Sequence, residues 1–479
     1  MKIHKVTQSL LSELNKFDIQ IPPSCLQTQN IHILANQSKQ ILTNILENIE
    51  IFHLKHTQIK HSFLSGNQKQ RKQKQGKQKQ GKQVKNITVE LLRQNKLPEK
   101  TSFFYNFIKD LKSNKLSKKE IYSYINFYNR ELYGYLMSLK RPKTLKNVLK
   151  WYPENILSNF VPLDVQDDII KNLGHKNTYT CTFGTNKIDM TIYSKTKKIN
   201  IFQKVILFTK AFFLFELLQL KNQYIPIHLF FSKETKKLPP NDNSSPVKFL
   251  GPREINSGLT LTSFLKTIPP TIVIFRKEEI EKVLLHELIH ATKHDKNLVN
   301  TDKIDIDVKC AFNVPKSTMI NFGETYTETT ALIVNSLFNS LLQKIPIQSI
   351  LKNEIRFSIL QCSKIMNFYG IKHMNTFFCD DCCFIDNGKE TWNEKTSVLS
   401  YFLLKTSNLL NLEYFIENFW ISHETTKSKN IVDAKFVFKF IKQTFHKYKN
   451  LFLINDLKTM KNKTLRMTLY DFDWTVEGL

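Results

Sequence analysis

The chain has 479 residues, of which 41% are hydrophobic, so it can bury a large core and is not a disordered chain as a whole. It carries 70 Lys and Arg against 42 Asp and Glu, a net charge of +28, which favours acidic partners such as nucleic acid or anionic surfaces and says nothing about catalysis. Lys, Asn, Ile and Phe are abundant and glycine is scarce, as AT-rich coding would produce, so part of this charge reflects composition.

The cysteine content and the N-terminal sequence point to an intracellular, reducing compartment. Seven cysteines are an odd number, and the first eight residues are polar, unlike a hydrophobic signal segment. The most apolar run, residues 205–220, is interrupted by Lys210 and Glu216 and is too short to span a bilayer. We therefore predict no transmembrane segment.

The first part of the chain reads as two helical regions joined by a linker. Residues 1–66 have apolar residues at helical spacing, for example Ile45, Ile49 and Phe52. Residues 67–86 are a Gln/Lys-rich, low-complexity segment that we predict to be a disordered linker, with 67–85 making a weak contact with polyanions. Residues 87–174 again read as a helical domain.

From residue 175 to 345 the pattern changes to mixed strands and helices. Two alternating segments, 178–183 and 188–193, predict a hairpin, and a long helix is expected over 199–220. Strands are predicted at 225–231, 255–262 and 271–275, and residues 346–479 read as a helical C-terminal subdomain. This order predicts an α+β fold in which a mixed sheet carries helices on one face.

The helix expected after the last strand contains the motif H-E-x-x-H, with His286, Glu287 and His290. Residues four apart lie on one face of a helix, so both imidazoles can reach one metal ion while Glu287 lies beside it. The surrounding residues are apolar on most sides, which predicts a buried helix. Burying two imidazoles and a carboxylate without partners is costly, so a metal site is favoured over a solvated helix face.

A second pair of acidic residues lies downstream, at the start of another helical pattern. Glu324 and Glu328 are also four residues apart, so either one has the spacing to face the first motif. The alternative is that both carboxylates simply complement the dipole at the N-terminus of a helix.

With these two motifs the chain resembles the zincin metallopeptidases, and among them the gluzincins. A metzincin is excluded because Lys293 and Lys296 occupy the positions of its Gly and third His, and His294 is discounted as a third ligand from one straight helix. The resemblance implies a zincin-like catalytic core at 175–345 that binds one Zn²⁺ through His286, His290 and Glu324. It also implies that Glu287 is the general base and that Glu328, where relatives usually carry Asp, orients a histidine ligand.

The resemblance also implies how a peptide or protein substrate is held. Gluzincins stabilise the oxyanion with a His, Tyr or Arg from the lower subdomain, and the sequence does not choose among the candidates Tyr326, His373, Tyr401 and His423. The strand before the last one is the sheet edge above the cleft. Its residues Asn256, Ser257 and Gly258 are expected to hold an extended peptide by strand addition.

Two alternatives remain open from the sequence. Cys379, Cys382 and Cys383, with His373 upstream, have some of the features of a second zinc site, but without a second Cys pair we expect free thiols. The alternative to an enzyme is a non-catalytic structural or nucleic-acid-associated basic protein that retains a zincin fold. An intact Glu287 favours the enzyme, because a purely structural site has no use for a general base.

Overall fold

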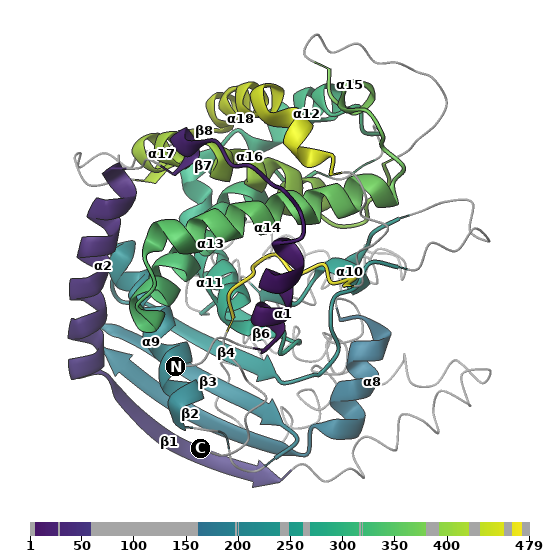
Figure 1. Cartoon of the computed structure of the whole chain (residues 1–479). Helices are drawn as coiled ribbons and strands as arrows, with labels where there is room; N and C mark the ends of the chain where they lie inside the picture. Colours follow the sequence, from purple (N-terminus) through teal and green to yellow (C-terminus); the bar gives the residue numbers. More distant parts are fainter. Residues whose placement is uncertain are drawn as a thin grey trace, which may run out of the picture.

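The computed structural model describes a layered arrangement of one sheet and many helices (Figure 1). It describes residues 5–26, 29–58, 161–196, 199, 201–239, 249–261, 269–315, 318, 320–379, 392–420, 432–454 and 462–471. The predicted linker at 67–86 and most of the predicted helical domain at 87–174 lie outside these residues.

A six-stranded mixed sheet forms the base of the molecule. Its strands run in the order β1-β2-β3-β4-β6-β5. The pairs β1–β2, β2–β3 and β6–β5 are antiparallel, and β3–β4 and β4–β6 are parallel. The strands are β1 (Glu50–Gln58), β2 (His175–Phe183), β3 (Asn186–Ser194), β4 (Tyr224–Phe230), β5 (Gly258–Leu261) and β6 (Thr271–Ile274). The predicted hairpin and the later strands are therefore present, with β5 at an edge.

We had predicted an entirely helical N-terminal region, but the structure shows that this region also contains a strand. Helix α2 (Gln29–Asn48) ends before Ile49, and the next residues form β1, which pairs with β2 from Glu50 opposite Thr182 to Gln58 opposite His175. Pairing with a strand more than a hundred residues away overrides the helical spacing of Ile49 and Phe52. The sheet thus extends beyond the predicted 175–345 core.

Both faces of the central strands are covered by helices, whereas we had predicted helices on one face only. On one face, Ile227 of β4 and Ile274 of β6 belong to the main core together with α9 (Ile201–Leu217) and α11 (Ile280–Ala291). On the other face, Val273 of β6 packs with α8 (Leu163–Asn172) in a smaller core. Because strands buried on both faces are apolar throughout, the sequence Thr-Ile-Val-Ile of β6 is typical of such a position.

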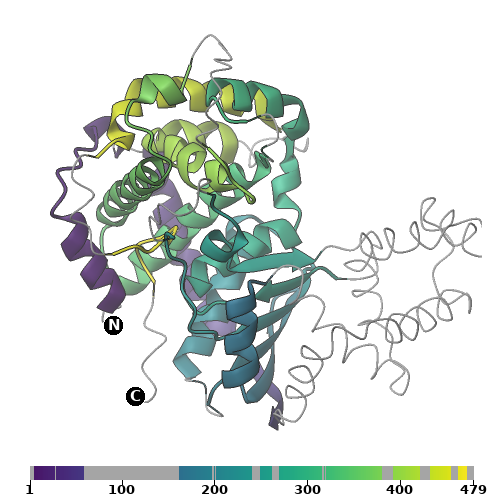
Figure 2. The ribbon, with the colours of Figure 1, turned by 90° about the vertical axis from the view of Figure 1, so that its right-hand side faces the viewer.

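Most of the remaining helices form the upper layer in Figure 1, and Figure 2 shows this layer above the sheet from the side. The longest are α13 (Gly323–Gln343) and α14 (Ile347–Phe368), which lie above α11 in Figure 1. The others are α12 (Asp305–Ala311), α15 (Met374–Phe377), α16 (Lys405–Leu410), α17 (Leu412–Phe415) and α18 (Ala434–Tyr448), with π-helical turns at Ser400–Leu404 and Ile416–Trp420 and a short strand pair, β7 (Leu298–Val299) and β8 (Val432–Asp433). Helices α1 (Lys5–Leu14) and α10 (Pro252–Ile255) lie lower, at about the height of α11 in Figure 1. The α+β class is thereby confirmed. No helix among the described residues is long and apolar enough to cross a membrane.

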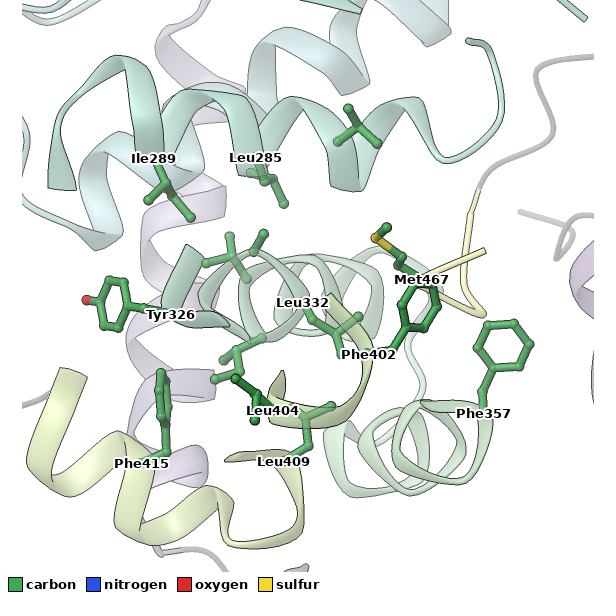
Figure 3. Packing of buried hydrophobic residues seen from close by; sticks show 14 of the residues in the cluster. Leu285, Ile289, Tyr326, Leu332, Phe357, Phe402, Leu404, Leu409, Phe415 and Met467 are labelled. Atoms are coloured by element: carbon green, nitrogen blue, oxygen red, sulfur yellow. The ribbon is translucent and has the colours of Figure 1, made fainter. Parts of the chain in front are cut away.

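Helix α11 lies between the sheet and the helical layer. Figure 3 shows Leu285 and Ile289 of α11 directed toward the layer that contains Tyr326 and Leu332 of α13. Leu285, Ile289 and Leu332 are fully buried, and burial of each such side chain contributes about 1.5–3 kcal/mol to stability. This packing fixes α13 against α11 and so determines which of its side chains face the histidines.

The C-terminal segment 462–471 returns to the core, an outcome that the sequence left open. Its backbone N–H groups are bound by buried carboxylates: Glu279 accepts from Met467 and Thr468, and Glu354 accepts from Leu469 and Tyr470. The N–H of Glu279, at the start of α11, donates in turn to Asp471. The segment is therefore anchored to the N-terminal end of α11.

Candidate metal centre

Helix α11 carries three of the predicted site residues into the interior. It follows β6 after a short turn in which Glu279 adopts a left-handed conformation, φ 58°. Every residue of the helix except His290 is buried. The apolar character of its sequence thus produces the burial that the sequence predicted.

Three potential ligand atoms converge between α11 and α13. The Nε2 atoms of His286 and His290 are 3.2 Å apart, and Oε2 of Glu324 lies 3.1 Å from the first and 3.2 Å from the second. Among the described residues these three are the group of His, Cys, Asp and Glu side chains that is close enough to hold one ion. The structure therefore brings together the three residues that the sequence proposed as ligands.

The outer nitrogen of each histidine faces a carboxylate. Nδ1 of His286 lies 2.9 Å from Oε2 of Glu328, and Nδ1 of His290 lies 3.0 Å from Oδ2 of Asp295. A carboxylate at Nδ1 holds the proton on that nitrogen, so that Nε2 carries the free lone pair. Glu328 is thus placed as the resemblance implies, whereas the sequence analysis did not identify Asp295.

Asp295 reaches His290 because the chain turns sharply at the end of α11. The helix ends at Ala291, and Lys293 takes a left-handed conformation with φ 59°. His294 then points elsewhere, with Nε2 3.1 Å from the hydroxyl of Tyr326. Our reason for discounting His294 was therefore wrong, since it is not on the same helix, although the structure does place it away from the three ligand atoms.

The electrostatics of the cluster favour a cation at its centre. Burial lowers the histidine pKa values, but hydrogen bonds and charges from Glu324, Glu328 and Asp295 outweigh it, so the pKa of His286 is raised and that of His290 is raised well above its usual value. Burial raises the pKa of Glu324, but the two histidines outweigh it and hold that pKa far below its usual range. Three mutually facing acceptors need a proton or a metal ion between them.

Glu287 lies beside this cluster and is held by the edge strand. Oγ1 of Thr260 on β5 donates to Oε2 of Glu287 at 2.7 Å. Burial raises the pKa of Glu287, against the lowering effect of His286, His290 and the Thr260 hydrogen bond. Among the described residues, the Glu287 carboxylate forms a hydrogen bond with Thr260 and none with the histidines. The carboxylate therefore remains available to a group bound at the centre.

The four candidate oxyanion stabilisers have different positions. The ring centroid of Tyr401 lies 5.8 Å from that of His286, and burial together with Glu324, Glu287 and Glu328 raises the pKa of Tyr401 well above its usual value. Tyr326 is turned toward His294, and His373 is exposed at the start of α15, which stands far from α11 in Figure 1. His423 lies outside the described residues. Among the described candidates, Tyr401 is therefore the one at the cluster.

The edge strand is shorter than predicted. Residues Pro252–Ile255 form the single helical turn α10, because the Glu254 carboxylate accepts the N–H of Gly251 and closes that turn. Asn256 and Ser257 therefore precede β5: Oδ1 of Asn256 accepts from Thr396 at 2.9 Å, and the carbonyl of Ser257 accepts from Phe275. Gly258 is the first residue of the strand, and within the described residues no further strand pairs with its outer edge.

The cysteines give no second metal site among the described residues. Cys379 is half-buried, and neither it nor the other described cysteines, Cys25, Cys181, Cys310 and Cys362, forms a disulfide. Cys382 and Cys383 lie outside the described residues, so the second-site alternative stays an untested prediction.

Comparisons with known proteins give one distant relative. The chain is 25% identical over 235 residues to uncharacterized protein R210 of Acanthamoeba polyphaga mimivirus, an alignment that covers 46% of this chain and 54% of that protein. The chain thus spans about half the length of this relative. No family model matches the chain, and no solved structure matches it. The function must be inferred from the chemistry of the site.

Proposed function

We propose that the chain is a zinc-dependent metallopeptidase of gluzincin type. The observation that carries the proposal is the set of three distances between the Nε2 atoms of His286 and His290 and Oε2 of Glu324, each 3.1–3.2 Å. Ligand atoms about 2.0–2.1 Å from a tetrahedral zinc ion are about 3.3–3.4 Å apart. The three donors therefore have the spacing of three corners of such a site.

The chemistry of the donor set fits zinc as well as the spacing does. Two imidazoles and one carboxylate are ligands that zinc prefers, and three protein ligands leave a fourth position for water, as in catalytic rather than structural sites. When bound, zinc would act as a Lewis acid and lower the pKa of a water molecule to about 7. This favours an enzyme over the alternative of a zincin fold that keeps its metal as a structural element.

The residues around the centre have complementary roles in this proposal. Glu287, whose pKa is raised by burial, takes a proton from the attacking water and returns it to the leaving amine. Thr260 keeps one oxygen of Glu287 in place. The phenol of Tyr401, which stays protonated, donates a hydrogen bond to the oxyanion that develops on the scissile carbonyl.

The outer edge of β5 would hold the substrate backbone. An unpaired edge offers N–H and C=O groups to an extended peptide, and Thr260 on this strand contacts the proposed general base. A peptide added to this edge would bring its carbonyl groups close to Glu287. The proposed substrate is accordingly an extended segment of a peptide or protein.

The test combines metal analysis with a hydrolysis assay on the full chain. We expect about one zinc ion per chain, loss of peptide hydrolysis on chelation, and a Glu287→Gln variant that keeps zinc but loses activity by 10²-fold or more. A folded chain that takes up no zinc would refute the proposal. A chain that holds zinc but hydrolyses no member of a broad peptide library would favour the structural alternative.

A further inference from the structure

One buried lysine lies next to the metal centre without touching it. Lys282 is on α11, one turn before His286, and its side chain is 2% exposed. It forms an ion pair with Oε1 of Glu328, whose side chain is completely buried. A lysine buried to this degree needs a counter-charge, and Glu328 supplies it.

The two oxygens of Glu328 are divided between two residues of the same helix face. Oε1 pairs with Lys282, and Oε2 lies 2.9 Å from Nδ1 of His286. Because Lys282 and His286 are four residues apart, they hold one carboxylate of α13 from two adjacent turns of α11. Rotation of the carboxylate away from His286 would therefore leave Lys282 without its partner.

We propose that Lys282 is a positioning residue for the metal centre: it fixes the carboxylate of Glu328 so that His286 presents Nε2 to the ion. The inference rests on the proposed zinc site and adds to it a residue that none of the motifs contains. Without the lysine, one oxygen of Glu328 would be buried with no ion-pair partner on α11. The ion pair would then no longer hold the carboxylate in its present orientation, and the orientation of the His286 ring would no longer be fixed.

The surroundings of Lys282 support a fixed rather than a mobile side chain. Its Nζ also lies 3.5 Å from Sδ of Met467, on the C-terminal segment that is anchored to the start of α11. Lys405 is a second buried cation near Glu328, but its Nζ donates to the carbonyl of Met467. Lys282 is thus the lysine that pairs directly with this carboxylate among the described residues.

The same helix offers a matched control. Lys210 of α9 forms a buried ion pair with Glu281 of α11, with side-chain exposures of 0% and 1%. Lys210 also donates to Asn335 of α13, and neither Glu281 nor Asn335 is a proposed ligand. Loss of either lysine removes one buried ion pair from α11, but only Lys282 contacts a residue that touches a proposed ligand.

The experiment compares zinc affinity and melting temperature of the metal-free full chain for Lys282→Met, Lys282→Arg and Lys210→Met. We expect both methionine variants to melt at lower temperature, while Lys282→Met alone binds zinc 10- to 100-fold more weakly and Lys282→Arg recovers most of the affinity. Wild-type affinity in Lys282→Met, or an equal loss in Lys210→Met, would overturn the inference. Failure of the wild-type chain to bind zinc would instead refute the proposed function, and the inference with it.

A double variant keeps the test decisive if Lys282→Met does not fold. Lys282→Met with Glu328→Gln removes both charges of the pair and leaves no unpaired buried ion. If Lys282 acts through Glu328, the double variant should bind zinc no more weakly than Glu328→Gln alone. A further loss of affinity in the double variant would show that Lys282 acts by another route and would refute the proposal.

Discussion

Gly258 on β5 lies directly against Glu287 on α11: a Cβ atom at Gly258 would stand 2.9 Å from Oε1 of Glu287 and 2.9 Å from Cγ1 of Val283. Side chains do not approach so closely, so either the carboxylate or the strand would have to move if any other residue replaced this glycine. The close approach of the sheet edge to the proposed general base thus depends on the absence of a side chain at Gly258.

We predict that Gly258→Ala impairs hydrolysis without removing the metal. The added methyl group displaces Glu287, and a displacement of about 1 Å in a catalytic group can cost about 10²-fold in rate. Because the atoms nearest to the added methyl group belong to Glu287 and Val283 and not to the three proposed ligands, zinc content should stay at the wild-type value. The measurement is hydrolysis rate against zinc content in the same preparation.

Gly251→Ala is the control for this variant. A Cβ atom at Gly251 would have its nearest neighbours at 3.6–3.8 Å, which is ordinary van der Waals contact. Activity should therefore be close to wild type. An active Gly258→Ala variant, or an equal loss in Gly251→Ala, would show that close packing at Gly258 has no bearing on Glu287.

The two carboxylates of α13 should differ in their effect on zinc affinity. Oε2 of Glu324 lies 3.1–3.2 Å from both Nε2 atoms, whereas Glu328 contacts His286 alone of the two histidines, and only at its outer nitrogen. Glu324→Gln should therefore lose most of the zinc affinity, and Glu328→Gln should lose about 10- to 100-fold. Zinc titrations of both variants at one pH measure the difference. If Glu328→Gln binds zinc more weakly than Glu324→Gln does, the assignment of the ligand is reversed.

Zinc affinity should fall as the pH is lowered, and Asp295 should set part of this dependence. Hydrogen bonds and charges from the carboxylates raise the pKa values of His286 and His290 in the metal-free chain, so protons compete with the metal for both rings. Asp295→Asn removes one of the groups that raise the pKa of His290, and the fall in affinity should then occur at lower pH. Zinc titrations of both proteins between pH 5 and 8 check this, and an unshifted profile would exclude a role for Asp295.

The sequence predicted the central part of this site because helical spacing is a local property. His286 and His290 share a face of α11, and Glu324 and Glu328 share a face of α13, as the four-residue intervals require. Apolar residues on both helices made their mutual burial predictable as well. The α+β class followed from the order of the elements, and the structure confirms it at that level, whereas the zincin resemblance remains a proposal.

Features that depend on distant or irregular parts of the chain were not predictable in this way. Asp295 reaches His290 only because Lys293, a residue that rarely favours positive φ, turns the chain back. Nothing in the sequence next to Lys282 distinguishes it from a solvent-exposed lysine. Its burial depends on Glu328, 46 residues later in the chain. Strand β1 forms by pairing with β2, which lies more than a hundred residues later in the chain, and the local sequence of β1 does not indicate this pairing.

Glu394 provides a test of the fold that does not involve the metal. Burial raises the pKa of this carboxyl to about 8, although Oε2 accepts from Trp392 and from the N–H of Leu399. Its folded-state pKa lies above the unfolded value, so the folded chain holds a proton that the unfolded chain releases. The stability that this group contributes is therefore complete below about pH 4.5 and is lost as the pH rises toward about 8.

We predict that Glu394→Gln, which keeps the shape and an acceptor oxygen but cannot ionise, is more stable than the wild-type chain at pH 8 and similar to it near pH 4.5. The melting temperature at pH 8 should rise by about 2 °C or more. Glu417→Gln, at an exposed position on the same chain, is the control and should leave the pH dependence unchanged. Thermal unfolding of the three metal-free proteins across this pH range measures the effect. Parallel curves for Glu394→Gln and wild type would mean that Glu394 does not hold a proton in the folded chain.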